Sequence, residues 1–133
     1  MITFSSRKKP SAPQVKALYR HAWWAKDRQI SKIRQMLSHT DLLFTCWEGA
    51  ALVGLARVNT DYAFRAVLFD VIVDPRFHRQ GLGTRLVENA LAHPDLRQVE
   101  QFWLYTTDKQ AFYERFGFRQ YPENVMILKK AKP

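Results

Sequence analysis

The stretch that decides the fold runs from Asp70 to Val87 and reads Asp-Val-Ile-Val-Asp-Pro-Arg-Phe-His-Arg-Gln-Gly-Leu-Gly-Thr-Arg-Leu-Val. It begins inside an apolar, β-branched run (67–73) that predicts a buried strand, and Asp74-Pro75 breaks this run. A loop containing Gly81 and Gly83 follows. The apolar residues after the loop recur at helical spacing and predict a helix with one buried face: Leu82, Leu86, Val87, Ala90 and Leu91.

A strand, a glycine loop and a helix in direct succession favour an anion-binding site. Glycines let the backbone approach a phosphate closely, N–H groups converge at the helix start, and the helix dipole attracts negative charge. A Walker A loop would need Lys and then Ser or Thr after its last glycine, and Gly83-Thr84-Arg85 lacks them. A dinucleotide fingerprint would need a third glycine where Leu86 stands. The third interpretation is the pyrophosphate loop of an acyl-CoA-dependent enzyme, and the plain alternative is a tight turn before a helix.

The loop His78-Arg79-Gln80-Gly81-Leu82-Gly83 resembles the Gln/Arg-x-x-Gly-x-Gly/Ala motif of the GNAT superfamily of N-acetyltransferases, except that His78 stands where Gln or Arg is usual. Further along the chain, Gln110–Phe118 is similar to the family's second signature, a Phe-Tyr-x-x-x-Gly-Phe helix. Gly117 is predicted to take a positive φ just past the end of that helix. Two signatures in the order found in the family indicate this family far more specifically than either signature alone. The resemblance covers roughly residues 42–128.

The chain is long enough for one domain with its own core, predicted to span residues 1–133. The resemblance implies an α+β class, the GNAT fold: a mixed, mostly antiparallel sheet that splays at the cofactor cleft, with helices on both faces. The patterns predict strands at 2–5, 42–47, 51–58, 67–73 and 102–105, and two more around Phe118 and at Val125–Leu128 that close the sheet. They predict helices from Pro13 to about Trp23, over 30–37, from Leu82 to about His93 and over Lys109–Phe116.

The composition is that of a folded and strongly basic chain, with 47% hydrophobic residues, a formal net charge of +9 and a pI near 10.0. Its basic residues are scattered, with short clusters only near the termini, which disfavours nucleic-acid binding. A positive field would instead steer a polyanionic cosubstrate toward its site. No apolar run is long enough for a membrane span, and no His, Cys and Asp cluster has metal-ligand spacing, so neither membrane nor metal is expected. The single Cys46 favours a small buried hydrophobe in a reducing, cytoplasmic protein.

The resemblance implies acetyl-CoA as the cosubstrate and assigns particular residues to it. The backbone of Val71, Ile72 and Val73 would pair with the pantetheine arm as though it were an extra strand, which requires only an unpaired strand edge. The backbone amides of six loop residues would surround the pyrophosphate: Arg79, Gln80, Gly81, Leu82, Gly83 and Thr84.

Two residues are predicted to be catalytic. Tyr113 falls on the tyrosine of the second signature, which in many relatives protonates the departing thiolate, and its alternative is a core tyrosine. Asp70 precedes the pantetheine-binding residues and could accept the amine proton, and its alternative is a carboxylate hydrogen-bonded inside the sheet. Asp61 and Glu48 are weaker candidates for the base.

The acceptor is suggested by a narrower resemblance, to the serotonin (arylalkylamine) N-acetyltransferases of plants and cyanobacteria. The matching residues lie in the segment 52–75: Gly54, Ala56, Arg57, Asp61, Ala63, Phe64 and Asp70. This branch implies a small arylalkylamine acceptor, with Tyr19, Trp23, Trp24 and Phe64 lining its pocket, although aromatics at helical spacing also fit a core. A protein lysine or N-terminal acetyltransferase and a noncatalytic acyl-CoA or nucleic-acid-binding module are the alternatives. A homodimer is common in this fold.

Overall fold

The computed structural model describes residues 1–131 and contains one five-stranded sheet. The strands lie in the order of the chain: β1 (Ile2–Ser5), β2 (Leu42–Glu48), β3 (Ala51–Thr60), β4 (Arg65–Val73) and β5 (Gln101–Trp103). The first four pair antiparallel, and β5 pairs parallel to β4. The predicted mixed, mostly antiparallel sheet is confirmed.

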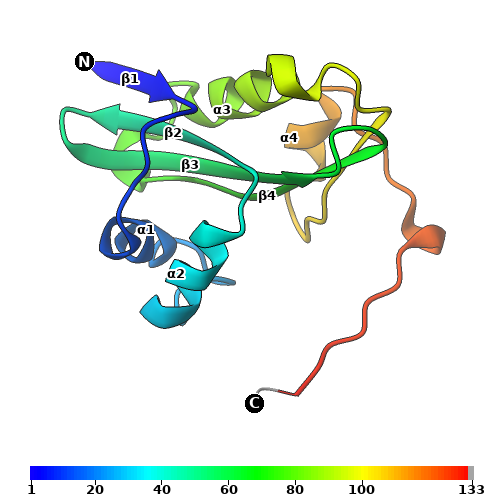
Figure 1. Cartoon of the computed structure of the whole chain (residues 1–133), viewed down its shortest axis with the longest axis horizontal. Coiled ribbons are helices and arrows are strands. Elements are labelled where there is room, and N and C mark those ends of the chain that lie inside the picture. The colour runs from blue at the N-terminus through cyan, green and yellow to red at the C-terminus, as the bar shows by residue number, and fades with distance from the viewer. Residues whose placement is uncertain (132–133) are drawn as a thin grey trace.

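Helices cover both faces of the sheet, as Figure 1 shows. Helices α1 (Ala12–Tyr19) and α2 (Ile30–Ser38) lie on one face, while α3 (Leu82–Leu91) and the short α4 (Gln110–Glu114) lie on the other. Ser11 begins α1 with a capping box, because its hydroxyl accepts the Gln14 N–H at 3.2 Å and the Gln14 side chain accepts the Ser11 N–H at 2.9 Å. Three 3₁₀ turns, η1 (Pro75–Phe77), η2 (Pro94–Leu96) and η3 (Pro122–Asn124), each begin with a proline.

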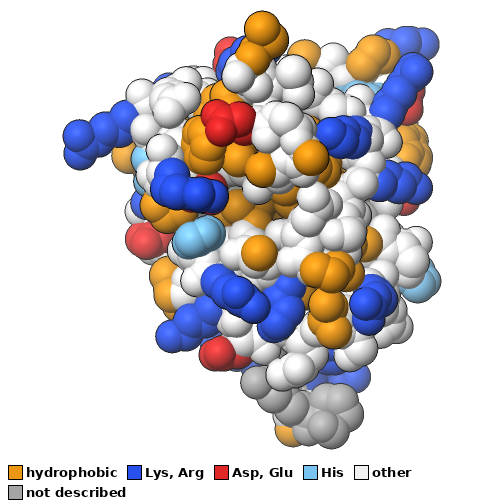
Figure 2. All heavy atoms as spheres, turned by 90° about the vertical axis from the view of Figure 1, so that its left-hand side faces the viewer, with side chains coloured by type: hydrophobic (Ala, Val, Ile, Leu, Met, Phe, Trp, Pro, Cys, Tyr) orange, Lys and Arg blue, Asp and Glu red, His pale blue; other side chains and the backbone are white. Residues whose placement is uncertain are grey.

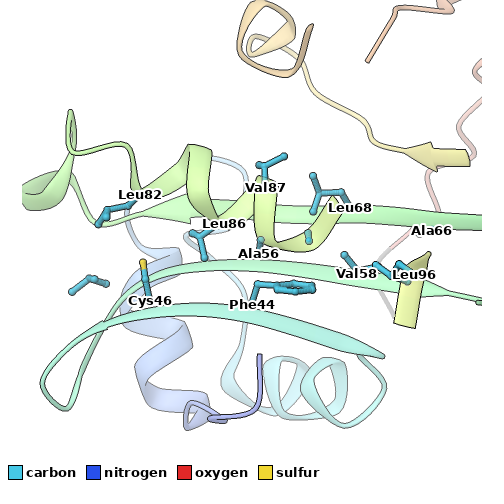
Figure 3. Close-up of a cluster of buried hydrophobic side chains, with 12 residues drawn as sticks. Phe44, Cys46, Ala56, Val58, Ala66, Leu68, Leu82, Leu86, Val87 and Leu96 are labelled. Carbon is cyan, nitrogen blue, oxygen red and sulfur yellow. The ribbon is translucent and has the colours of Figure 1, made fainter. Parts of the chain in front are cut away.

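The main core lies between α3 and the sheet (Figure 3). Leu86 and Val87 of α3 are completely buried there, against Phe44 and Cys46 of β2 and the small side chains of β3. Gly54 of β3 is required at this contact, since a Cβ on Gly54 would clash with the Cys46 sulfur and approach Leu86 Cδ1 to 3.1 Å. A second cluster on the opposite face packs α1 and α2 against β3 and β4.

Strand β4 carries a bulge next to its open edge. Ile72 pairs with Leu55 and Phe69 pairs with Arg57, so two β4 residues, Asp70 and Val71, stand opposite the single residue between them on β3. Asp70 takes a positive φ of 54°, which a residue with a Cβ rarely adopts. On the other side of β4, β5 pairs only with residues 65–67. The sheet therefore opens beyond Val67, as the predicted splay requires.

The C-terminal third differs from the prediction. The strands expected around Phe118 and at Val125–Leu128 are wrong, because these residues form no strand and no ladder with β5. Apolar, β-branched sequence is not sufficient for a strand, which also needs a neighbour to bond its backbone. Strand β5 and helix α4 are also shorter than the predicted 102–105 and 109–116. Gly117 has the predicted positive φ, at 97°.

Candidate active site

The free edge of β4 forms one wall of the candidate site. From Leu68 to Val73 this edge has no neighbouring strand, because the paired part of β5 ends opposite Val67. The three residues predicted to pair with a pantetheine arm, Val71, Ile72 and Val73, belong to this stretch. An extended ligand can bond to such an edge through backbone groups alone.

The loop after β4 delivers free backbone N–H groups to the start of α3. Arg79 and Gly81 take positive φ values of 65° and 73°, and Gly81 is the N-cap residue. The first N–H of α3 with a backbone partner is that of Arg85, which donates to the Gly81 carbonyl at 3.1 Å. Among residues 1–131, the N–H groups of the six predicted loop residues have no hydrogen-bond partner: Arg79, Gln80, Gly81, Leu82, Gly83 and Thr84. Together with the positive end of the helix dipole, they fit an anion.

Gly83, the second glycine of the loop, is not required by the fold. Its φ is not in the left-handed region, and a Cβ there would meet Phe112 at 3.7 Å and Val73 at 3.8 Å, which are ordinary contacts. An alanine would therefore fit at this position, in agreement with the Gly/Ala alternative of the motif, and the anion site depends on the free backbone N–H groups. His78, the departure from the motif, lies with Nε2 at 2.9 Å from the Val73 carbonyl oxygen and joins the loop to the end of β4.

Asp70 is the centre of a buried ionic cluster beneath the bulge. One carboxylate oxygen, Oδ2, accepts from Arg57 Nε at 2.7 Å, Tyr19 Oη at 2.7 Å and Arg28 Nη1 at 2.9 Å. Burial by itself would raise the pKa of Asp70, but the two guanidinium groups and the Tyr19 hydroxyl outweigh burial and lower this pKa. The carboxylate is therefore ionised, and its charge is balanced by the two guanidinium groups. This is the arrangement of the alternative given for Asp70, a carboxylate hydrogen-bonded inside the sheet.

Tyr113 faces the same region from α4. Burial and the Asp70 carboxylate raise the pKa of Tyr113 to about 12, so its phenol is neutral and able to donate a proton. Its ring packs edge-on against Phe112 and Phe118, with ring centres 4.9 and 6.0 Å apart. Its hydroxyl has no hydrogen-bond partner in the described chain, although the ring is partly buried. The structure thus brings the two predicted catalytic residues within electrostatic reach of each other.

The four aromatic residues predicted to hold the acceptor do not form one pocket. Tyr19 is completely buried, and its hydroxyl is bonded to Asp70. Trp23 and Trp24 lie in the connection between α1 and α2, exposed by 65% and 41%. Phe64 lies at the other end of β4, about 20 Å from Asp70 along the strand. It borders a separate hollow of about 370 Å³ with Asp61, Arg65, Glu100 and Gln101.

Arg28 and Arg57 are site residues to which the sequence analysis gave no role, although Arg57 is among the residues that match the narrower resemblance. Arg57 stands in the middle of a buried strand, and a buried Arg in such a run is itself a signal for a paired carboxylate. Arg28 lies in a loop and gives no such signal. Its guanidinium carbon lies 4.9 Å from the Tyr19 ring centre and 5.4 Å from that of Trp24.

Asp61 and Glu48, the weaker candidates for the general base, have other roles or positions. The carboxylate of Asp61 accepts the backbone N–H groups of Ala63, Phe64 and Arg65 at 2.8–3.1 Å, which fixes the turn between β3 and β4. These bonds lower the pKa of Asp61. Glu48 is exposed at the end of β2, beside the turn into β3.

The surface beside the turn between β2 and β3 is basic but not continuously so. Figure 2 shows Lys and Arg side chains, single or in small groups, around exposed apolar side chains on this face. This distribution suits long-range attraction of an anion more than a track for a nucleic-acid backbone. Within residues 1–131, no helix has the length and apolar character that a membrane crossing requires.

Comparison with known proteins identifies the class of protein to which this chain belongs. The family described as Acetyltransferase (GNAT) matches residues 6–118, which include both signatures, the free β4 edge and Tyr113. The chain therefore belongs to the GNAT family of acetyltransferases, whose acetyl donor is acetyl-CoA. The free N–H groups before α3 fit the phosphates of that donor.

Three curated proteins that are similar to this chain have names that state different acetyltransferases. GCN5-related N-acetyltransferase 2, chloroplastic, from Arabidopsis thaliana is 40% identical over 56% of this chain and 29% of its own length. Histone acetyltransferase TAP1 from Glycine max is 29% identical over 93% of this chain and 58% of its own. Serotonin N-acetyltransferase 2, chloroplastic, from Oryza sativa is 28% identical over 74% of this chain and 52% of its own. This chain thus matches less than two thirds of the length of each.

Solved structures share the fold over almost the whole chain. A candidate GNAT acetyltransferase from Xanthomonas campestris is 29% identical, with a TM-score of 0.86 over 98% of this chain and 94% of that one. An acetyltransferase from Clostridium acetobutylicum, solved with acetyl-CoA, has a TM-score of 0.76 over 96% of each chain at 9% identity, which shows the common fold alone.

Proposed function

We propose that this protein transfers the acetyl group of acetyl-CoA to the primary amine of a small arylalkylamine by direct attack in a ternary complex. The observation that carries the proposal is the convergence of three features. The free edge of β4 leads into the unbonded N–H groups before α3, and α4 with the neutral Tyr113 phenol adjoins them. Phe112 of α4 lies beside Gly83 and Arg115 donates to the Thr84 hydroxyl at 3.3 Å.

The β4 edge and the following loop would hold the donor. Val71, Ile72 and Val73 would pair with the pantetheine arm through their backbone, and the amides of 79–84 would surround the pyrophosphate. Acetyl-CoA, when bound, supplies an activated thioester carbonyl. The scattered positive charge of the chain raises the rate at which such a polyanion arrives.

Tyr113 would be the general acid. The attack needs an unprotonated amine, and the departing thiolate needs a proton. Tyr113 carries a proton on Oη at neutral pH because its pKa is about 12, and its hydroxyl is free to donate it. Cys46 has no part in the transfer, since burial raises the pKa of its thiol to about 11 and keeps it protonated.

Asp70 would influence the acceptor amine. As a proton acceptor it is weakened by Arg57 and Arg28, which lower its pKa. Its second oxygen, Oδ1, accepts no hydrogen bond from the described chain and would orient the amine or a bridging water. The acid limb of the pH–rate profile distinguishes these roles, since loss of that limb in Asp70→Asn identifies Asp70 as the titrating base.

An aromatic acceptor is supported by the connection between α1 and α2. There the Arg28 guanidinium lies between the rings of Tyr19 and Trp24 and remains 36% exposed, and a planar guanidinium stacks well with a further aromatic ring. The similarity to a rice protein named as a serotonin N-acetyltransferase supports the same acceptor class. Phe64 is left out of the proposed acceptor pocket, because it borders a separate hollow at the other end of β4.

The decisive test is Tyr113→Phe assayed by thiol release from acetyl-CoA with tryptamine, serotonin and phenylethylamine. We expect kcat to fall by about 100-fold or more, as for loss of a general acid. The affinity for acetyl-CoA and the melting temperature should change little. Wild-type turnover in Tyr113→Phe would exclude the role.

A protein acceptor, at a lysine or an N-terminus, is the second candidate function. It is favoured by the match to a protein named histone acetyltransferase, which extends over 93% of this chain. Lysine-containing peptides belong in the same assay, and turnover on peptides with none on aromatic amines would replace the first proposal by the second. If both aromatic amines and peptides are acetylated, the acceptor with the larger kcat/KM is the preferred one.

A cytoplasmic location remains a prediction. The buried free Cys46 suits a reducing compartment, and two of the relatives are named as chloroplastic. Detection of the tagged chain in a cell fraction would test it.

A further inference from the structure

The ionic cluster at Asp70 carries more positive charge than negative charge. A single carboxylate, Asp70, faces two guanidinium groups, with Arg57 Nε at 2.7 Å and Arg28 Nη1 at 2.9 Å. Tyr19 adds no charge, because burial and the Asp70 carboxylate raise its pKa above the ordinary value. Within residues 1–131, no other acidic side chain pairs with either arginine. One positive charge is therefore left in excess, beside the free edge of β4.

Arg28 is the member of this cluster that faces solvent. Its side chain is 36% exposed, whereas those of Arg57 and Asp70 are 10% and 6% exposed. Nη1 of Arg28 donates to Asp70, and Nε and Nη2 have no hydrogen-bond partner among residues 1–131. In a guanidinium group, Nε and one Nη form a fork that binds a carboxylate through two parallel hydrogen bonds. The fork of Arg28 is thus free to bind a carboxylate from outside the chain.

The surroundings of Arg28 hold this guanidinium in place. Its backbone N–H donates to the Ala25 carbonyl at 3.1 Å, and its carbonyl accepts from Lys16 Nζ at 2.7 Å. Its guanidinium carbon lies near two aromatic ring centres, that of Tyr19 at 4.9 Å and that of Trp24 at 5.4 Å. A side chain that is already ordered loses less conformational entropy when it binds a ligand. The Lys16 ammonium adds a further positive charge beside the same loop, which attracts an anionic group.

We propose that Arg28 binds a carboxylate of the acceptor, and that the acceptor is an aromatic α-amino acid. This inference rests on the proposed function, because it narrows the arylalkylamine of that function to one that carries a carboxylate. The ion pair of Arg28 and Asp70 presents a positive and a negative group 2.9 Å apart. An α-amino acid carries a carboxylate and an amine on one carbon atom, so its two groups match this pair.

Each part of such an acceptor has a partner in the site. The carboxylate would occupy the free fork of Arg28, and the amine would face Asp70 Oδ1, which accepts no hydrogen bond from the described chain. The aromatic ring would lie against Trp24, which is 41% exposed beside the guanidinium. The donors of a guanidinium lie in its plane, so binding a carboxylate leaves its faces available to rings.

The excess positive charge also suits the amine that must react. Like charges disfavour the protonated form of an amine, so Arg28 and Arg57 would lower the pKa of an ammonium group held beside them. The neutral nitrogen then attacks the thioester carbonyl, which forms the amide C–N bond and breaks the C–S bond. The amine proton passes to a water at Asp70, and Tyr113 protonates the thiolate. The products are an N-acetylated amino acid and CoA.

Three acceptors that share one ring test the role of the carboxylate. L-Tryptophan carries it, tryptophanamide replaces it by a neutral amide of similar shape, and tryptamine lacks it. In the thiol-release assay, we expect the wild-type kcat/KM for tryptophan to exceed the other two by about tenfold or more, as for one charged hydrogen-bonded contact. Equal or better use of tryptophanamide or tryptamine overturns the inference and leaves the proposed function intact. Turnover on peptides, with none on these three acceptors, overturns both.

Arg28→Met tests the residue itself. We expect the preference for tryptophan over tryptamine to fall by about 10- to 100-fold, since methionine keeps the apolar contact with the rings but cannot bind a carboxylate. Arg28→Lys should recover only part of the preference, because an ammonium group lacks the fork. Arg34→Met, at an exposed arginine of α2, is the matched control and should keep the wild-type preference. An unchanged preference in Arg28→Met overturns the inference.

A binding measurement separates recognition of the carboxylate from a structural role of Arg28. Arg28→Met removes one of the three hydrogen bonds to Asp70, so a lower melting temperature is expected. Loss of folded protein lowers kcat/KM for every acceptor by the same factor, so it does not change the preference. Calorimetric titration of the CoA-loaded protein with tryptophan should show a dissociation constant about 10- to 100-fold higher in Arg28→Met than in the wild type. Equal dissociation constants overturn the inference.

Discussion

Residues 1–96 and residues 97–131 are held together in different ways. Every fully buried side chain of the described chain lies in the first region, and the last of them is Leu96. The second region contains β5, α4 and the C-terminal residues 118–131, and its apolar side chains are half-buried or exposed. The first region has the ionic cluster at Asp70, and the second has Tyr113.

This difference shows that the buried core and the proposed general acid lie in different regions of the molecule. The first region has a complete core and supplies the rigid β4 edge and the start of α3. The second region carries the proposed acid on a five-residue helix that depends on its neighbours. Elements with few buried contacts open locally at low free energy, so ligand or partner binding is expected to order the second region most.

The largest effect should come from Leu86→Ala, in the core of the first region. Leu86 is completely buried between α3 and the sheet, so we expect a loss of about 2–5 kcal/mol in the free energy of unfolding. Leu104→Ala, in the half-buried second region, is the matched variant, and we expect about 1 kcal/mol. Urea unfolding followed by far-UV circular dichroism measures both. Leu104 packs against the edge of the core that contains Leu86, so equal losses would mean that the half-buried edge contributes as much as the buried centre, which would break the comparison.

The next effect should come from Arg57→Met, which removes one partner of the buried Asp70 carboxylate. Arg28 and Tyr19 still bond to Asp70, so we expect a loss of about 2 kcal/mol. Arg65→Met is the control, since Arg65 is exposed and lies over Trp103 instead. A double variant that adds Asp70→Asn should recover part of the loss, and its failure to do so would show that Arg57 acts through packing alone.

Acid should weaken the first region through the same cluster. The pKa of Asp70 is lower in the folded chain than in the unfolded chain, so its ion pairs stabilise the fold fully above the unfolded value of about 4. This stabilisation is lost as the pH falls through the lower, folded pKa. Urea midpoints measured from pH 7 down to pH 3 should therefore fall less steeply for Asp70→Asn than for the wild type. Identical slopes would show that Asp70 is no part of the acid sensitivity.

The parts of the fold that could be predicted are those encoded by neighbouring residues. The antiparallel strands, the glycine loop, the α3 helix and the positive φ of Gly117 all follow from local pattern and turn chemistry. The β4 bulge and the ionic cluster could not be predicted, because Asp70 meets residues 13, 42 and 51 positions away along the chain. Register and side-chain pairing across such distances are settled only by the packing of the whole sheet.

Residues 125–128 show the opposite error. Val125–Leu128 has the local pattern of a strand, but these residues form no strand and are exposed by 48–94%. A local pattern carries no information about whether a neighbouring strand is available to bond the backbone. Arg57 illustrates the same limit. An arginine within an apolar strand pattern indicates a buried acidic partner, but the sequence alone does not identify that partner as Asp70.

The smallest effect on stability should come from Gly83→Ala, at the boundary between the two regions. The added Cβ would touch Phe112 of the second region and Val73 of the first at ordinary distances, and alanine is the better helix former by up to about 1 kcal/mol. We expect unfolding to be unchanged or slightly harder. The affinity for CoA should also stay close to that of the wild type, because the motif accepts alanine here and the backbone N–H groups remain available.

Gly54→Ala is the matched glycine variant, and its expected effect on stability is the reverse. Its Cβ would clash with Cys46 inside the first region, so it should destabilise the chain by about 1–3 kcal/mol. The fraction that stays folded should keep its affinity for CoA. Thermal melts and calorimetric titration with CoA measure both quantities for both variants. Loss of CoA binding in a stable Gly83→Ala would mean that the donor approaches residue 83 itself more closely than binding through the free N–H groups requires.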